Sequence, residues 1–156
     1  MDADCLIKLT KAGLKELIAG YDTIHIPEVV WKEVVDAGKA KGRPDASLVE
    51  TNIAAKRILV TGKSSSPGRG DDALIKGFQE EEYDAVATDD RKLIRNLKAA
   101  RIPFVLPGLI LYSLKQRGRI DQETTLRCLD QLATFISRDE YSTENSLSGK
   151  QPSCSD

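Results

Sequence analysis

Histidine and cysteine are scarce in this chain, which has one histidine and three cysteines among 156 residues. The cysteines (Cys5, Cys128 and Cys154) are far apart and include no C-x-x-C pair. Because zinc sites need four Cys or His ligands at characteristic spacing, the sequence argues against a zinc protein. An odd, scattered set of cysteines is typical of reduced thiols, so we expect a cytoplasmic protein.

The sequence also lacks an apolar run as long as a membrane span and an N-terminal signal peptide, so no membrane association is expected. It has no excess of positive charge either: the formal net charge is −1. Net charge therefore neither indicates nor excludes nucleic-acid binding, and the local distribution of charge matters more. Hydrophobic content of 40% and a length of 156 residues fit one globular domain with a sizeable core.

Strand-like segments alternate with amphipathic helical segments along the chain. The pattern predicts strands at 23–26, 57–60, 84–88 and 103–106, and helices at 6–18, 27–37, 44–55, 71–82, 91–100, 107–117 and 121–137. Such alternation predicts an α/β fold with a mostly parallel sheet. From residue 138 onward Ser, Glu, Asn and Gly dominate, so we predict a domain over 1–137 and a disordered tail over 138–156.

Two predicted helices carry a carboxylate within their apolar stripe. Glu33 follows Val30 by three residues, and Asp71 precedes Leu74 by three residues, so each acid falls on the face predicted to be buried. Buried charges persist only when they are paired or hold a metal. The pattern therefore predicts a bound cation.

Further acids occur near Asp2 and at the end of a predicted strand. Asp89 and Asp90 directly follow the 84–88 strand, and ligand sites in parallel sheets lie beyond the carboxyl ends of the strands. Asp4 and Asp90 also suit helix N-caps, so both roles stay open. Three basic residues come next and either hold phosphates near the site or form a solvated helix face: Arg91, Lys92 and Arg95.

Four segments, in this order, resemble the motifs of the PIN-domain family of nucleases over residues 2 to about 120. They are D-A-D-C-L-I at 2–7, P-E-V-V-W-K-E at 27–33, G-D-D at 70–72 and T-D-D at 88–90. The segment 11–17 is similar to the archaeal and bacterial branch that includes VapC-type toxins. The resemblance implies a three-layer α/β/α sandwich around a central, mostly parallel sheet.

Two features depart from the family pattern. An Asp stands after Gly70 where the family usually has Glu, and Asp is one methylene shorter. Only Met1 precedes Asp2, where the family has a first strand. Either the start is truncated or residues 2–6 form that strand.

What the resemblance implies is hydrolysis of RNA phosphodiester bonds with Mg²⁺ or Mn²⁺, which prefer oxygen ligands. The implied catalytic residues are Asp2, Glu33, Asp71 and Asp90. The implied metal ligands are Asp2, Asp71, Asp72, Asp89 and Asp90, with Asp71 ranked above Asp72, and one or both of Asp89 and Asp90 reaching the metal. Asp4 and Thr88 support them, and Arg91, Lys92 and Arg95 contact the RNA.

Expected partners are the RNA substrate, an antitoxin if the protein is a toxin, and a second copy of the chain. The apolar faces of 107–117 and 121–137 offer surface for a homodimer. Two alternatives stay open. One is a PIN fold that binds nucleic acid or protein without turnover. The other is a haloacid-dehalogenase-type phosphatase, whose D-x-D motif the 2–4 segment imitates, although that leaves Glu33 unexplained.

Overall fold

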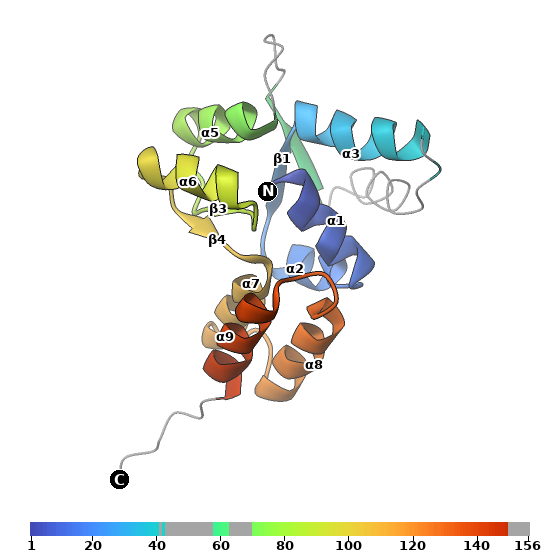
Figure 1. Cartoon of the computed structure of the whole chain (residues 1–156), viewed down its shortest axis with the longest axis vertical. Helices are drawn as coiled ribbons and strands as arrows, with labels where there is room; N and C mark the ends of the chain where they lie inside the picture. Colours follow the sequence, from blue (N-terminus) through green and yellow to red (C-terminus); the bar gives the residue numbers. More distant parts are fainter. Residues whose placement is uncertain (41, 43–57, 63–69, 150–156) are drawn as a thin grey trace.

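The computed structural model describes residues 1–40, 42, 58–62 and 70–149, which form an arrangement of helices around short parallel strands (Figure 1). The helices are α1 (Ala3–Lys11), α2 (Lys15–Tyr21), α3 (Glu28–Ala40), α5 (Gly70–Glu80), α6 (Arg91–Ala99), α7 (Pro107–Gln116), α8 (Gln122–Leu132) and α9 (Arg138–Gly149). The helix expected over 44–55 lies outside the described residues. Within those residues, no helix is long and apolar enough to cross a bilayer.

The strands pair in parallel, which confirms the α/β fold predicted from the alternating pattern. Strand β1 (Ile24–Pro27) pairs with β2 (Ile58–Thr61), and β3 (Val86–Ala87) pairs with β4 (Phe104–Val105). In the described part of the chain these pairs are two separate two-stranded sheets. The last two strands are shorter than the sequence pattern predicts.

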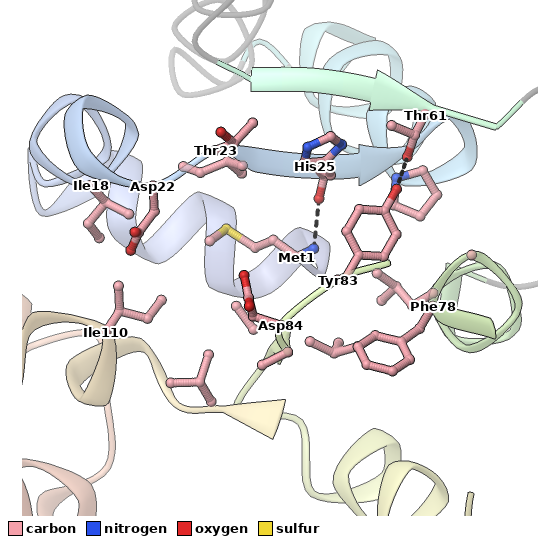
Figure 2. Close-up of a pocket in the computed structure, with 18 of the residues that line it drawn as sticks. Met1, Ile18, Asp22, Thr23, His25, Thr61, Phe78, Tyr83, Asp84 and Ile110 are labelled. Atoms are coloured by element: carbon pink, nitrogen blue, oxygen red, sulfur yellow. Dashed lines mark hydrogen bonds between the residues drawn. The ribbon is translucent and has the colours of Figure 1, made fainter. Parts of the chain in front are cut away.

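The amino terminus lies between the two strand pairs. The amino group of Met1 donates a hydrogen bond to the carbonyl oxygen of His25 in β1, at 2.8 Å (Figure 2). The next amide, that of Asp2, donates to the carbonyl oxygen of Ala87 in β3, at 3.0 Å. Residues 3–11 are helical, so the hypothesis that 2–6 form a first strand is wrong. Met1 and Asp2 hydrogen-bond to β1 and β3 in the place where such a strand would lie.

The single helix expected over 6–18 is two helices, because the chain turns at Gly13. Gly13 has a φ of +71°, in the left-handed region that glycine adopts without a Cβ penalty. The amide of Gly13 donates to the carbonyl oxygen of Thr10, and that of Leu14 donates to the carbonyl oxygen of Leu9. These bonds end α1 and allow α2 to begin in a new direction.

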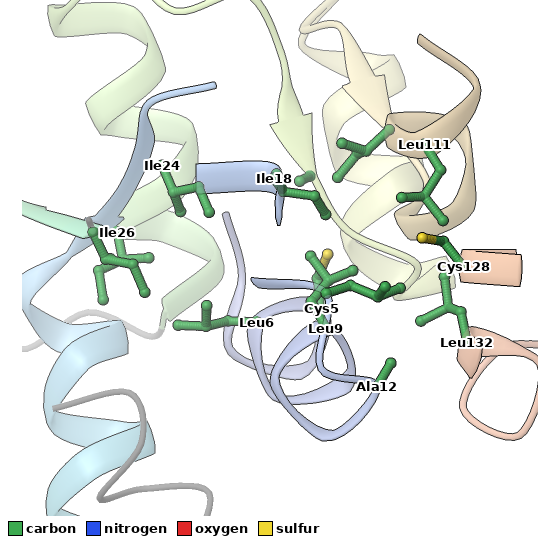
Figure 3. Packing of buried hydrophobic residues seen from close by; sticks show 14 of the residues in the cluster. Cys5, Leu6, Leu9, Ala12, Ile18, Ile24, Ile26, Leu111, Cys128 and Leu132 are labelled. Atoms are coloured by element: carbon green, nitrogen blue, oxygen red, sulfur yellow. The ribbon is translucent and has the colours of Figure 1, made fainter. Parts of the chain in front are cut away.

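Helix α1 is the centre of the main hydrophobic core. Cys5, Leu6 and Leu9 are completely buried between β1 and the helices α7 and α8, which contribute residues such as Leu111 and Leu132 (Figure 3). A smaller cluster lies under α6 and includes Leu74, Val86, Leu93 and Leu97. Burial of one face of α1 fixes the position of its amino end, where Asp2 lies.

The segment expected to be a disordered tail is, over 138–149, the helix α9. It packs against α7 and α8 at the end of the molecule opposite α3 and α5 (Figure 1). The hydroxyl of Tyr141 donates to Asp130 of α8 at 2.6 Å. Two carboxylates of α9, those of Glu140 and Glu144, are buried against the start of α7. Helix α9 thus covers part of the apolar surface that the sequence offered for a dimer.

Candidate active site

Asp2 is a buried carboxylate held at the junction of α1 and β3. It is the N-cap of α1, and its Oδ1 accepts a hydrogen bond from the amide of Cys5 at 2.8 Å. Its Oδ2 accepts from the hydroxyl of Thr88, which follows β3. Burial raises the pKa of Asp2 to about 6, although these two hydrogen bonds lower it in part. The carboxylate is therefore mostly ionised at neutral pH and held in one orientation.

Thr88 and the two acids after it lie at the carboxyl end of β3, as the strand pattern predicted. Thr88 is completely buried, and its hydroxyl also accepts a hydrogen bond from the amide of Asp90 at 3.1 Å. Asp90 is exposed and caps α6, since its Oδ1 accepts from the amide of Leu93 at 2.7 Å. Asp89 is more buried than Asp90 and close enough to Asp2 for their charges to repel. The two residues therefore differ: Asp90 caps a helix, and Asp89 pairs with Lys8 of α1.

Lys8 also lies at this site, although the sequence did not single it out. Its ammonium group forms an ion pair with the Asp89 carboxylate, which is distant by 81 residues in the sequence. Burial alone would lower the pKa of Lys8, but the hydrogen bond to Asp89 and the charges of Asp4 and Asp2 raise it. The only sequence signal is the four-residue spacing from Asp4, which suggests a helix-surface pair instead. Lys8 thus balances the negative charge of Asp89.

Glu33 is placed differently from the prediction. Val30, Val34 and Val35 form the buried face of α3, whereas Glu33 lies at the edge of that face and is exposed. Its carboxylate approaches the start of α5: a Cβ built on Gly70 would lie 3.3 Å from Glu33 Oε2. The absence of a side chain at residue 70 therefore allows the second acidic motif to lie directly against the third.

The remaining predicted residues are near the surface. Asp71 is half-buried and Asp72 is exposed, both in the first turn of α5. Asp4 is exposed on α1. The three predicted RNA-binding residues of α6 are all exposed: Arg91, Lys92 and Arg95.

The acids lie in two places: Asp2 and Asp89 lie near the end of β3, and Glu33 lies against the start of α5, whose first turn carries Asp71 and Asp72. Among residues 1–40, 42, 58–62 and 70–149, no three Asp, Glu, His or Cys side chains form a ready metal cage. The donor set nevertheless fits Mg²⁺ or Mn²⁺, because such ions take one or two carboxylates and keep several waters. Asp2 and Asp89 are two hard oxygen donors close enough for their charges to interact, and they would hold the ion once Asp89 releases Lys8.

Comparison with known proteins gives one match. A family model described as a PIN domain matches residues 1–149, which is nearly the whole chain. No curated protein and no solved structure matches the chain significantly.

Proposed function

The chain belongs to the PIN-domain family, whose members are generally nucleases, and we propose that it is a metal-dependent endoribonuclease. The observation that carries this proposal is the arrangement around Asp2. A buried, ionised carboxylate is held by Thr88 at the end of β3, with Asp89 next to it. Substrates of α/β proteins bind at this end of the strands.

In this proposal the residues of the site have different roles in cleavage. Asp2 and Asp89 would hold a divalent ion, which when bound polarises the scissile phosphate and activates water. Thr88 orients the Asp2 carboxylate through its hydroxyl. The exposed basic residues on the first two turns of α6 would position the RNA backbone through its phosphates: Arg91, Lys92 and Arg95.

The second acidic group, Glu33 with Asp71, would complete the site from the other side. Glu33 lies against Gly70, immediately before Asp71, so these acids can act as one unit. We propose that metal and RNA draw the two groups together. This would explain why four acids occur in order along the sequence although the described residues form no cage.

The test is cleavage of a mixed pool of structured and single-stranded RNAs with EDTA, Mg²⁺ or Mn²⁺. Asp2→Asn should abolish cleavage and weaken Mn²⁺ binding measured by calorimetry. Asp121→Asn is the matched control, because Asp121 is also an N-cap and accepts from the Thr124 amide at 2.7 Å. Equal cleavage by both variants would contradict the proposal.

Asp89→Asn and Asp90→Asn separate the two acids that follow Thr88. If Asp89 is the ligand, Asp89→Asn should reduce Mn²⁺ affinity, whereas Asp90→Asn should leave it unchanged, because the Asn oxygen can still accept from the Leu93 amide and cap α6. The reverse result would assign the metal to Asp90.

A non-catalytic PIN module is the second candidate, and the Lys8–Asp89 ion pair favours it. A protein that folds, binds RNA and neither cleaves it nor binds Mn²⁺ would support this alternative. The phosphatase hypothesis is dropped, because the family match is to a PIN domain.

A toxin role and its antitoxin remain proposals. Arrest of growth on induction, relieved by Asp2→Asn, would support the toxin role. A homodimer also remains a proposal, to be tested by light scattering.

A further inference from the structure

A cavity of about 330 Å³ lies beside Asp89, among residues of α6, α9 and the start of α7. Ile94 and Leu109 give it an apolar lining, and α9 contributes two glutamates, Glu140 and Glu144. We call it the α9 cavity. It provides space next to Asp89 into which a neighbouring side chain can move.

The two glutamates of the α9 cavity are buried with little compensation. Glu140 is 8% exposed, and its Oε1 accepts a long hydrogen bond from the Gly108 amide, at 3.4 Å. Glu144 is 1% exposed, and its oxygens have no hydrogen-bond partner within the described residues. The amino end of α7, beside Gly108, offsets roughly half an elementary charge. Two buried carboxyl groups one helical turn apart therefore favour a cation close by.

Lys8 is a cation within electrostatic reach of these acids. Its ammonium group pairs with Asp89, and it is close enough to Glu140 for their charges to attract. Asp89 and Glu140 also line the same cavity. The Lys8 side chain is 27% exposed and has a flexible four-carbon stem, so it can change partner while α1 stays in place.

Three other charged groups bear on the choice of that partner. Asp4 precedes Lys8 by one helical turn and attracts it, but Asp4 is exposed, so water and salt weaken such a pair. Asp2 attracts Lys8 as well, but Asp2 would itself hold the metal. Arg91, a cation that lines the α9 cavity, is exposed at the first position of α6. Because charges interact more strongly away from water, the buried Glu140 is the better second partner for Lys8.

The inference rests on the proposed function, in which Asp2 and Asp89 hold a divalent ion. We propose that Lys8 has two partners: it pairs with Asp89 in the free protein, and with Glu140 in the α9 cavity once a metal ion binds Asp89. Glu140 is thus a positioning residue that acts on the metal site through Lys8. Helix α9 then belongs to the site, because it holds a displaced cation that would otherwise repel the ion.

Asp89→Asn tests the second partner without any metal, because this change takes the first partner away. In that background, urea unfolding measures the coupling between Lys8→Met and Glu140→Gln in a double-mutant cycle. The coupling should be about tenfold in the unfolding equilibrium constant, which corresponds to about 1.4 kcal/mol, and close to zero when Asp89 is present. Asp4→Asn in place of Glu140→Gln is the matched control and should show no such increase.

Nuclear magnetic resonance follows the change of partner when metal is added. Mg²⁺ should shift the signal of the Glu140 carboxyl carbon in the wild type. The shift should be much smaller in Lys8→Met, which has no ammonium group to transfer. The Asp4 carboxyl carbon is the internal control and should keep its position. Glu140→Gln and Asp4→Asn assign the two signals.

Two outcomes would overturn the proposal. One is absence of coupling between Lys8 and Glu140 in the Asp89→Asn background. The other is a coupling, or a shift on addition of Mg²⁺, at Asp4 and not at Glu140. Failure of the proposed function gives a different result: Mg²⁺ moves neither signal, although the coupling in Asp89→Asn is present. That result would confirm Glu140 as the second partner and reject metal as the cause of the exchange.

Discussion

Glu144 gives the sharpest prediction about stability, because its carboxylate is buried in α9 with little compensation. The residue is 1% exposed, and neither carboxylate oxygen makes a hydrogen bond within the part of the chain that the structure describes. Burial raises the pKa of Glu144 to about 8, and repulsion from Glu140 adds to the rise. The proton is therefore bound more tightly in the folded protein than in the unfolded chain.

The sign of the pH dependence follows from this difference. Below about pH 4.5, the ordinary pKa, the residue is protonated in both states and opposes folding least. As the pH rises towards about 8, the unfolded chain releases the proton and the folded protein keeps it, so the free energy of unfolding falls. At about 1.4 kcal/mol per pKa unit, the full loss is at most about 5 kcal/mol.

Glu144→Gln removes this titration and keeps the shape of the side chain. Urea unfolding followed by circular dichroism at pH 5, 7 and 9 should show that the wild type loses several kcal/mol more than the variant. Glu123→Gln is the control, because Glu123 is exposed on the neighbouring helix α8 and should follow the wild type. Glu144→Leu should be more stable than the wild type at pH 9.

The result that would refute this reasoning is equal pH dependence in the wild type and Glu144→Gln. Water would then reach the Glu144 carboxylate, and α9 would not be held against α7 as the structure places it. Other groups titrate in this range, so the difference between the two proteins, and not either curve alone, is the test.

Three further predictions concern single residues. Gly108→Ala should lower the free energy of unfolding by about 1–3 kcal/mol, because the added Cβ would overlap the Glu144 carboxylate. In urea titrations this loss should vanish when Glu144 is also replaced by Ala. An equal loss with Glu144 and with Ala at that position would contradict the prediction. Lys8→Met should tighten Mn²⁺ binding about tenfold in calorimetry, since Asp89 loses its ion pair; weaker binding would mean that Lys8 supports the metal. Gly13→Ala should cost about 1 kcal/mol in urea unfolding, because alanine is strained at a φ of +71°; an unchanged midpoint would count against this.

Local sequence patterns predicted the order of the elements well, because burial periodicity is a local property. They failed where tertiary contacts decide. The break at Gly13 depends on a positive φ that no hydrophobic pattern shows. Helix α9 was missed because its composition is polar, and its two buried glutamates, Glu140 and Glu144, look like a solvated face. In the structure this segment is helical and packs against α7 and α8.

The same contrast holds for the candidate site: local patterns predicted some of its contacts, and tertiary contacts decided the others. The proximity of three site residues could be predicted, because each lies at the end of a strand or the start of a helix: Asp2, Thr88 and Asp89. The pairing of Lys8 with Asp89 could not, since it joins residues far apart in the sequence. Glu33 was assigned to the buried stripe because a helical wheel does not show where that stripe ends.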